Sequence, residues 1–561
     1  MNRSENIQRL RQETFDLCII GGGASGAGCA LDAALRGLKV ALVEKNDFAA
    51  GTSSKSTKLI HGGVRYLEQA FKHLDFAQLR QVRHGLEERH IVLQNAPHLA
   101  HPLSIVTPVG TWWESVYYGI GLRLYDWFAS GKDHLPKSRR LSKTETLRRI
   151  PGLHENIYGA VQYFDGQLDD ARYCLALVQS AAAAGAVVAN HLEITGFQKN
   201  SAGALTAANS RDLYLPGENC PGREFQFPIR ATLFLNCTGP HADHIRLLAN
   251  PAAEPRIRPS KGVHVVLPLE VLGSAEALLI PKTRDGRLVF AIPFEGKLLL
   301  GTTDEDYPHK EIEPLLEARE VEYLLETLQP FLKEKINPIV IKAGFGGLRP
   351  LVSAAPRTPG QSKTKSLLRD HEVEHEPVSQ LLSLLGGKWT TYRLMAKDAV
   401  DQVCHLLGMK RECRTESHLL HGGKDWTSDF WKKIKEKYGF NSDISQHLAQ
   451  KYGTFAEVPA ELAIRHAESG ERILPGFPFL KAEIVYAARA EMACTIRDFL
   501  ARRIRLEMSD WQASIEAAPV VAQIMGQELG WTEQRMQQES DAYKTLLEGF
   551  RMQANGNHAA G

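Results

Sequence analysis

The first apolar run of the chain, residues 16–20, begins a pattern that changes from strand to helix and back to strand. A glycine-rich turn at 21–26 follows it, then a helical pattern to about Arg36 and a second apolar run at 39–43. Short apolar runs bounded by turn residues suit buried strands, and the stretch between them has the spacing of a helix. We therefore expect a strand–helix–strand unit of an α/β domain near the N-terminus.

Strand-like patterns recur in the middle of the chain. An apolar strand is expected at 232–236, where it runs into a small Thr-Gly turn. Further strand-like stretches are Val263–Leu267, Leu288–Ile292 and Leu298–Gly301. Because they are short and closely spaced, we expect them to form an antiparallel sheet.

Helical patterns are expected at three further places. Asp169 precedes an alanine-rich stretch at 171–184, and aspartate is favoured as a helix cap, so its role is expected to be structural. Another helical pattern runs to Leu407, with Gly408 as the expected stop. The C-terminal quarter of the chain is helical throughout, Glu491–Leu506 being one example, and it predicts a separate helical domain.

Composition narrows the class of protein. The 561 residues carry a formal net charge of +2, so no nucleic-acid partner is expected. The eight cysteines include no C-x-x-C pair and several lie in apolar runs, which predicts core thiols in a reducing compartment, without a disulfide framework or a metal site. No apolar stretch is long enough to span a bilayer, and the first strand begins so early that no leader peptide is expected.

The turn at 21–26 has the pattern G-x-G-x-x-G and carries the first chemistry. Gly21 suits a tight turn, Gly23 lets the backbone approach a pyrophosphate, and Gly26 lets the helix pack on the strand. The helix N-terminus offers free N–H groups to phosphates, and Glu44 follows the second strand, where a carboxylate can accept ribose hydroxyls. The residues expected at an ADP-containing dinucleotide are Gly21, Gly23, Ala24, Ser25, Gly26 and Glu44.

Three later segments decide between FAD and NAD. Residues 51–66 are rich in small hydroxyl residues and glycine, 232–239 end a strand in Thr-Gly, and 384–393 place glycines before a helix. Such segments can wrap a flavin, and a helix N-terminus can stabilise reduced flavin. FAD is therefore expected. The further expected cofactor residues are Thr52, Ser53, Ser54, Ser56, Lys58, Leu59, Ile60, His61, Thr238, Gly239, Gly387, Lys388, Trp389 and Thr390.

With these motifs, the chain resembles the FAD-dependent glycerol-3-phosphate dehydrogenases, within the D-amino-acid-oxidase-like flavoproteins, from about Glu13 to about Phe550. The motifs that carry the resemblance are 53–67, Asp169-Asp-Ala-Arg172, Lys261-Gly-Val-His264, Gly301-Thr-Thr-Asp304, Gly346-Gly-Leu-Arg-Pro350 and Gly386-Gly-Lys-Trp-Thr-Thr-Tyr-Arg393. His241 and Trp389 depart from the common pattern, where tryptophan and a smaller aliphatic residue are usual, so local packing there is open to question.

The resemblance implies an α/β fold: an FAD-binding Rossmann-like domain with an antiparallel β-sheet substrate domain, plus a C-terminal α-helical domain. The expected segments are FAD-binding at about 13–75, 150–250 and 346–408, substrate-binding at about 76–149 and 251–345, a helical domain at 409–552 and a disordered tail at 553–561.

The implied substrate, sn-glycerol 3-phosphate, is a secondary alcohol with a phosphate dianion, which is oxidised to dihydroxyacetone phosphate. A phosphate favours arginine's planar fork, and the resemblance places Arg65, Arg349 and Arg369 around the substrate pocket. Lys388 can reach the substrate oxygen or the flavin, and Tyr66 can hydrogen-bond the phosphate.

Two histidines are candidates for the base that takes the hydroxyl proton. His61 is the first, because the ordinary pKa of histidine suits proton abstraction near neutral pH, and His264 is the second. A flavin-packing role remains the alternative for His61. The expected catalytic set is His61, Arg349 and Lys388, and the expected FAD is non-covalent.

No second nucleotide motif is present to bind NAD, which leaves a membrane quinone or oxygen as the electron acceptor. Oxygen-using relatives often carry a long insertion between the Arg-Pro and Gly-Gly-Lys motifs, and the stretch 351–385 is short, which favours quinone.

Residues 111–128 hold seven aromatic side chains and suit a lipid interface, with an aromatic domain contact as the alternative. Residues 430–438 form a second, basic candidate for the membrane-binding surface.

We therefore expect a peripheral protein on the cytoplasmic face of a membrane, with a homo-oligomer as one open arrangement. The alternatives are a glycerol-3-phosphate oxidase, an amine oxidase of the same superfamily, and a non-catalytic module with this fold. The cluster of phosphate-suited cations opposes the amine oxidase, and the retention of every chemistry-bearing motif opposes the non-catalytic module.

Overall fold

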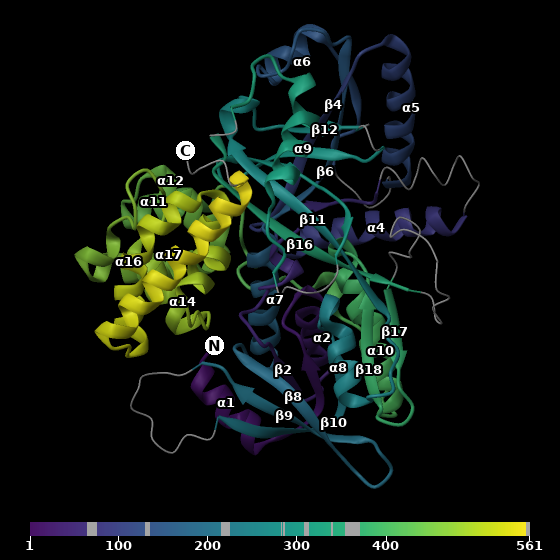
Figure 1. Ribbon diagram of the computed structural model, residues 1–561, viewed down its shortest axis with the longest axis vertical. Coiled ribbons are helices and arrows are strands. Elements are labelled where there is room, and N and C mark those ends of the chain that lie inside the picture. The colour runs from purple at the N-terminus through teal and green to yellow at the C-terminus, as the bar shows by residue number, and fades with distance from the viewer. Residues whose placement is uncertain are drawn as a thin grey trace.

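The computed structural model describes residues 1–63, 76–129, 135–214, 225–281, 283, 286–307, 313–337, 340–353 and 371–556. Two sheets occupy opposite halves of the molecule, and a group of C-terminal helices lies beside them (Figure 1). The predicted α/β class with a separate helical domain is confirmed.

The first sheet is built around the predicted N-terminal unit. Its order is β17-β18-β10-β1-β2-β7, and the contacts from β18 to β7 are parallel. β9 pairs antiparallel with β10 and with β8. The strands are β1 (Thr14–Ile20), β2 (Val40–Val43), β7 (Val187–Ala189), β8 (Leu192–Lys199), β9 (Leu205–Asp212), β10 (Gln226–Asn236), β17 (His371–His375) and β18 (Leu381–Gly386).

Three predicted helices pack together in one core with this sheet: α2 (Ala24–Leu35), α7 (Asp170–Ala183) and α10 (Tyr392–Leu406). Asp169 caps α7 by accepting a hydrogen bond from the Arg172 backbone. Gly28 lets α2 approach α10, because a Cβ there would lie 2.9 Å from the Tyr392 ring. Gly408, at φ +67°, follows the end of α10 as expected. α1 (Arg3–Gln12) and α8 (Ala242–Ala249) complete this half.

The second sheet has the order β15-β11-β14-β13-β12-β4-β6-β3, with β16 on β11 and β5 on β6. It is antiparallel as expected, except that β12 and β4 run parallel. The strands are β3 (Leu59–Ile60), β4 (Ala100–Val109), β5 (Arg139–Ser142), β6 (Gly159–Leu168), β11 (Ile257–Pro268), β12 (Ala277–Ile280), β13 (Val289–Phe294), β14 (Lys297–Gly301), β15 (Glu305–Asp306) and β16 (Ala343–Val352). Its helices are α4 (Phe76–Asn95), α5 (Trp112–Ala129), α6 (Lys143–Arg149) and α9 (Ala318–Leu328).

Three strands differ from the expected division of the chain. β3, β6 and most of β16 lie in segments assigned to the FAD-binding domain, yet all three belong to the second sheet. All three are largely buried on both faces, so their apolar pattern is the same whichever sheet they join.

The C-terminal domain contains α11 (Phe430–Tyr438), α12 (Ser442–Tyr452), α13 (Glu457–Arg465), α14 (Lys481–Ala490), α15 (Leu506–Ser509), α16 (Trp511–Leu529) and α17 (Glu533–Asn555). The single helix expected over Glu491–Leu506 is wrong: Met492 and Arg505 have positive φ, and only a π-helical turn at Asp498–Arg503 lies between them. α17 continues to Asn555, into the stretch expected to be disordered.

Candidate active site

The glycine turn between β1 and α2 has contacts that exclude larger residues. Gly21 has φ +111°, and a Cβ on it would lie 2.7 Å from the Cys237 carbonyl oxygen. A Cβ on Gly26 would lie 1.8 Å from the oxygen of Gly21. The turn therefore lies directly against the end of β10, at the N-terminus of α2, whose dipole favours an anionic ligand.

Glu44 closes this turn from the end of β2. Its carboxylate accepts hydrogen bonds from the Gly22 N–H at 2.6 Å and the Asn46 N–H at 2.9 Å. Burial raises the pKa of Glu44, and these two N–H groups oppose that shift. The structure thus places Glu44 beside the phosphate turn, as the sequence predicted.

The connection between β2 and β3, residues 44–58 (the β2–β3 loop), joins the turn to distant segments. Ser53 Oγ accepts from the Ala24 N–H at 2.9 Å, and the Ser53 carbonyl accepts from Trp389 Nε1 at 3.0 Å. Thr52 Oγ1 donates to the Leu348 carbonyl at 2.7 Å. Residues expected at the cofactor from three parts of the chain therefore meet around this loop.

Trp389, which departs from the family pattern, has a defined place in the packing. Its ring stands edge-on to Tyr173 and Tyr392, with centroids 5.4 and 5.3 Å away. Together with its bond to Ser53, this contact fixes the short helical turn 389–391 against the β2–β3 loop. The packing question raised by the sequence is answered by these two tyrosines.

His61 and the Thr-Gly turn lie at the ends of their strands. His61 is exposed just beyond β3, and its backbone N–H donates to Thr390 Oγ1 at 3.4 Å. Thr238 Oγ1 donates to Asn236 at 2.7 Å, which holds the turn after β10 beneath Gly21. Gly239 and Gly387, both at positive φ, and half-buried Lys388 belong to the turns that follow β10 and β18.

Arg349 lies on β16, and its side chain reaches across Gly262 of the neighbouring strand β11. Its guanidinium donates to Asp304 at 3.2 Å and to the Thr303 carbonyl at 3.0 Å. A Cβ on Gly262 would lie 2.4 Å from the Arg349 guanidinium, so only glycine allows this placement. The sequence identified Arg349 but not its acidic partner, because the spacing between them follows no local period.

His264, the second candidate base, lies in a buried position. It is 3% exposed, its ring stacks on Phe345 with centroids 4.9 Å apart, and its Nε2 lies 3.1 Å from Thr57 Oγ1. Burial, with Lys58 and Arg349 nearby, lowers its pKa well below the ordinary value. His264 therefore holds the β2–β3 loop as a neutral imidazole, and the exposed His61 is the better placed candidate base.

Asp170, at the start of α7, binds several members of the same loop. Its Oδ2 accepts from the Ser56 N–H and hydroxyl and, at 2.6 Å, from Lys58 Nζ, which also donates to the Ser54 carbonyl. Burial lowers the pKa of Lys58 to about 8. Asp170 belongs to a motif that the sequence identified, but its support of the loop could not be predicted from that motif.

Three predicted substrate residues, Arg65, Tyr66 and Arg369, lie outside the described residues. The other predicted site residues lie at the ends of β1, β2, β10 and β18 or along the β2–β3 loop and the facing strands β11 and β16. This arrangement is that of a cofactor site at the carboxyl ends of parallel strands.

Comparison with known proteins gives consistent matches along the chain. The FAD-dependent oxidoreductase family model matches residues 16–371, and the C-terminal domain of alpha-glycerophosphate oxidase matches 413–536. A probable mitochondrial glycerol-3-phosphate dehydrogenase of Caenorhabditis elegans is 43% identical over 96% of this chain and 73% of its own length. The mitochondrial glycerol-3-phosphate dehydrogenase of Rattus norvegicus is 40% identical over 97% of this chain and 75% of its own length.

The chain belongs to the family of FAD-dependent glycerol-3-phosphate dehydrogenases.

A solved glycerol-3-phosphate dehydrogenase from Bacillus halodurans, complexed with FAD, covers 100% of this chain and 98% of its own, with a TM-score of 0.78 and 28% identity. FAD is accordingly the cofactor of this glycerol-3-phosphate dehydrogenase family member. The residues fit it, because the glycine turn lets the backbone approach a pyrophosphate at the N-terminus of α2, and Glu44 lies beside that turn.

Proposed function

We propose that this protein oxidises sn-glycerol 3-phosphate to dihydroxyacetone phosphate and passes the electrons to a membrane quinone. The observation that carries the proposal is the fixed cation Arg349, which lies on the strand that binds Thr52 of the cofactor loop. A guanidinium held in this way can bind a phosphate dianion beside the cofactor.

Each site residue has a proposed role at a stated atom. The exposed imidazole of His61 takes the proton of the C2 hydroxyl, and Arg349 and Lys388 orient the substrate oxygens. Arg65, Tyr66 and Arg369 add phosphate contacts, and His264 holds Thr57 of the β2–β3 loop. FAD, when bound, accepts the hydride that leaves C2.

The membrane part of the proposal rests on α5. The exposed side chains Trp113, Tyr117, Ile120 and Trp127 repeat at helical spacing, and Trp113 is 73% exposed. The helix lies at the outer edge of the half that contains the second sheet (Figure 1). Among the described residues, no helix combines the length and the apolar character needed to cross a bilayer. We propose peripheral binding through this stripe, on the cytoplasmic face.

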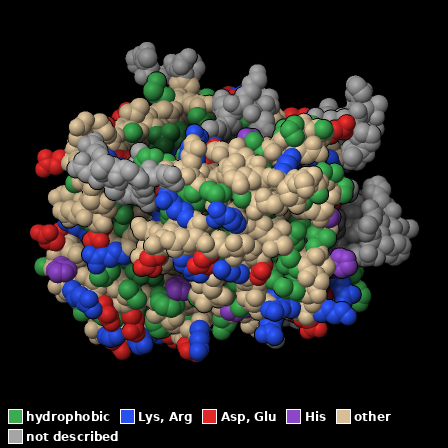
Figure 2. Space-filling model, turned by 90° about the horizontal axis from the view of Figure 1, so that it is seen from below, with side chains coloured by type: hydrophobic (Ala, Val, Ile, Leu, Met, Phe, Trp, Pro, Cys, Tyr) green, Lys and Arg blue, Asp and Glu red, His purple; other side chains and the backbone are tan. Residues whose placement is uncertain are grey.

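The basic candidate at 430–438 is less suited to an anionic surface. Lys433 and Lys437 of α11 both pair with Glu457, at 2.8 and 2.9 Å, and Lys432 pairs with Asp429. Figure 2 shows positive and negative side chains intermingled on the face that it draws. Neutralised cations attract anionic lipid weakly, so apolar α5 is the better anchor.

A second candidate function is an oxidase that uses oxygen on the same substrate. It is favoured by the match of residues 413–536 to a domain described from alpha-glycerophosphate oxidase. The two functions share the site described above and differ in the acceptor that reoxidises the flavin.

The test is anaerobic reduction of the purified holoenzyme by glycerol 3-phosphate, followed by addition of either a soluble quinone or oxygen. We expect the flavin absorption band to bleach with glycerol 3-phosphate but not with glycerol, and quinone to restore it faster than oxygen. Faster recovery with oxygen would make the oxidase correct, and an unbleached flavin would exclude both functions.

A further inference from the structure

One segment of the C-terminal domain, residues 497–505, contains four arginines, and each of them reaches the β2–β3 loop or a residue that holds it. We call it the arginine segment. Arg502, Arg503 and Arg505 are buried, which is costly for a cation unless an acid lies beside it. Each of them has a partner outside the C-terminal domain, next to the cofactor site, and each also contacts a residue of its own domain: Asp498, Glu491 or Ala501.

At the first end of the loop, Asp47 receives two arginines. Arg502 Nε donates to Asp47 Oδ2 at 2.6 Å, and the Arg503 guanidinium donates to both oxygens, at 2.7 and 3.0 Å. Asp47 is fully buried and lies three residues after Glu44 in the chain. The C-terminal domain therefore supplies the cations that neutralise this carboxylate.

At the centre of the loop, Arg505 binds Ser54 and Asp170 together. Its Nη2 donates to the Ser54 carbonyl at 3.0 Å and to Asp170 Oδ1 at 2.9 Å. Lys58 Nζ donates to the same Ser54 carbonyl at 2.7 Å and to the other Asp170 oxygen, Oδ2, at 2.6 Å. Ser54 adjoins Ser53, whose hydroxyl binds the first N–H of α2.

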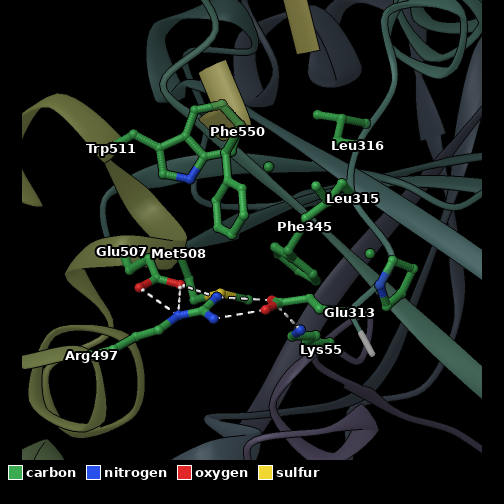
Figure 3. A pocket seen from close by; sticks show the side chains of 13 residues that line it. Lys55, Glu313, Leu315, Leu316, Phe345, Arg497, Glu507, Met508, Trp511 and Phe550 are labelled. Carbon is green, nitrogen blue, oxygen red and sulfur yellow. Dashed lines mark hydrogen bonds and ion pairs between the residues drawn. The ribbon is translucent and has the colours of Figure 1, made fainter. Parts of the chain in front are cut away.

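At the residue that follows Ser54, two ion pairs through Glu313 join Lys55 to Arg497. Arg497 donates to both Glu313 oxygens at 2.7 and 2.8 Å, and Lys55 donates to Glu313 at 2.5 Å (Figure 3). Arg497 also pairs with Glu507 of its own domain at 2.9 Å. The two cations Lys55 and Arg497 thus balance the two acids Glu313 and Glu507.

These contacts couple the C-terminal domain to the conformation of the cofactor loop. Without the arginine segment, Asp47 and Asp170 would be left as buried carboxylates with fewer cations beside them, and the loop would have to rearrange to hydrate them. A loop that must be ordered to bind FAD would then bind it less tightly.

We propose that the arginine segment is a clamp for FAD: the C-terminal domain orders the β2–β3 loop, and FAD binding in turn tightens the docking of that domain. Arg505 and Arg503 are its positioning residues. The proposal deepens the proposed function at the cofactor step, and it rests on that function only for the binding of FAD.

The test compares FAD affinity among full-length variants, by adding FAD to the apoprotein and following the quenching of its fluorescence. We expect Arg505→Gln and Arg503→Gln to raise the FAD dissociation constant at least tenfold, and Arg505→Lys to recover part of the loss. Arg246→Gln is the matched control, because Arg246 is also buried and pairs with Asp243 and Glu374, away from the loop. Equal affinities in the Arg505→Gln and Arg246→Gln variants at equal apoprotein stability would overturn the proposal.

A second measurement does not depend on the variants folding. Amide hydrogen exchange of the native chain, with and without FAD, should show faster exchange after FAD removal both in the β2–β3 loop and in residues 498–509. Faster exchange in the loop alone would contradict the coupling. Neither measurement uses a substrate, so the clamp can stand even if glycerol 3-phosphate fails to bleach the flavin.

Discussion

Arg349 is held by so many neighbours that it behaves as a fixed charge. Its guanidinium is held in one position by hydrogen bonds to Asp304 and to the Thr303 carbonyl, and it packs on the backbone of Gly262. A fixed cation loses little conformational entropy when a phosphate binds to it, which favours both affinity and orientation.

We predict that Arg349→Lys lowers kcat/KM for glycerol 3-phosphate. The expected loss of transition-state stabilisation is about 1.5–3 kcal/mol, because lysine keeps the positive charge but loses the two parallel N–H donors of the guanidinium. Steady-state kinetics with glycerol 3-phosphate and glycerol measure the effect. Arg256→Lys is the control, since Arg256, just before β11, pairs with Glu372 and Glu374 of β17 in the first sheet. An unchanged preference for the phosphorylated substrate would show that Arg349 does not hold the phosphate.

His98, between α4 and β4, makes stability depend on pH. Burial and the nearby Arg172 lower its pKa to about 3, whereas an unfolded chain would bind a proton near 6.5. Between these values the unfolded state holds more protons, so this histidine's contribution to stability is complete above 6.5 and is lost as pH falls.

We predict that His98→Gln flattens the acid side of the stability profile between pH 6 and 4 by about 1.4 kcal/mol per pH unit. Urea unfolding at a series of pH values measures it, and His244→Gln, at an exposed position on α8, is the control. A slope equal in the two variants would contradict the assignment.

At the scale of single elements, α5 has two distinct faces. Its exposed stripe includes Trp113 and Trp127, while Tyr125 on the opposite face is 1% exposed. The Tyr125 hydroxyl accepts from the Gly62 N–H at 2.8 Å and donates to Asp165 at 3.0 Å. The aromatic helix is thus bonded directly to the residue that follows the candidate base.

We predict that native protein floats with liposomes at high salt, because apolar burial is not screened by ions. Changing Trp112 and Trp113 to Ser should abolish flotation, whereas changing Lys433 and Lys437 to Gln should not. If the tryptophan variant floats as well as the native protein, α5 is not the anchor.

We predict that Tyr125→Phe lowers the free energy of unfolding by about 1–3 kcal/mol, since it leaves the buried Gly62 N–H without its acceptor. Denaturant unfolding measures this loss. We also expect kcat to fall more than KM rises, because the backbone beside His61 is less firmly held. Tyr158→Phe, at a side chain that is 50% exposed, is the control, and equal unfolding energies would exclude the predicted role.

Local patterns predicted those elements whose residues interact with near neighbours. The strand–turn–helix unit, the Asp169 cap and the Gly408 stop follow from short-range rules of backbone geometry. Residues 491–506 follow none of them, because their charged side chains are buried against Asp47 and Asp170 instead of facing solvent. Predicting a surface helix from its hydrophobic pattern assumes that its charged side chains face solvent, and in this segment they do not.

At the scale of the whole molecule, the site combines motifs that sequence can reveal with supports that it cannot. Glu44, Ser53 and Trp389 were predicted from their motifs and belong to or bind one loop, and Arg349 follows Leu348, which binds the same loop. Their supports Asp47 and Glu313 belong to no motif, and Asp170 and Asp304 belong to motifs that do not reveal their partners, because an ion pair between distant residues has no spacing along the chain.

The long-range pairings of β1 have a consequence for how the protein is made. β1 pairs with β10, which pairs with β18, and the arginine segment follows more than a hundred residues later. During synthesis the first glycine turn and β2 emerge early, β10 and β18 follow later, and the cations of Asp47 leave the ribosome near the end. The nascent chain must therefore keep a half-built sheet from aggregating until almost the whole chain has been translated, and FAD can be captured firmly only then.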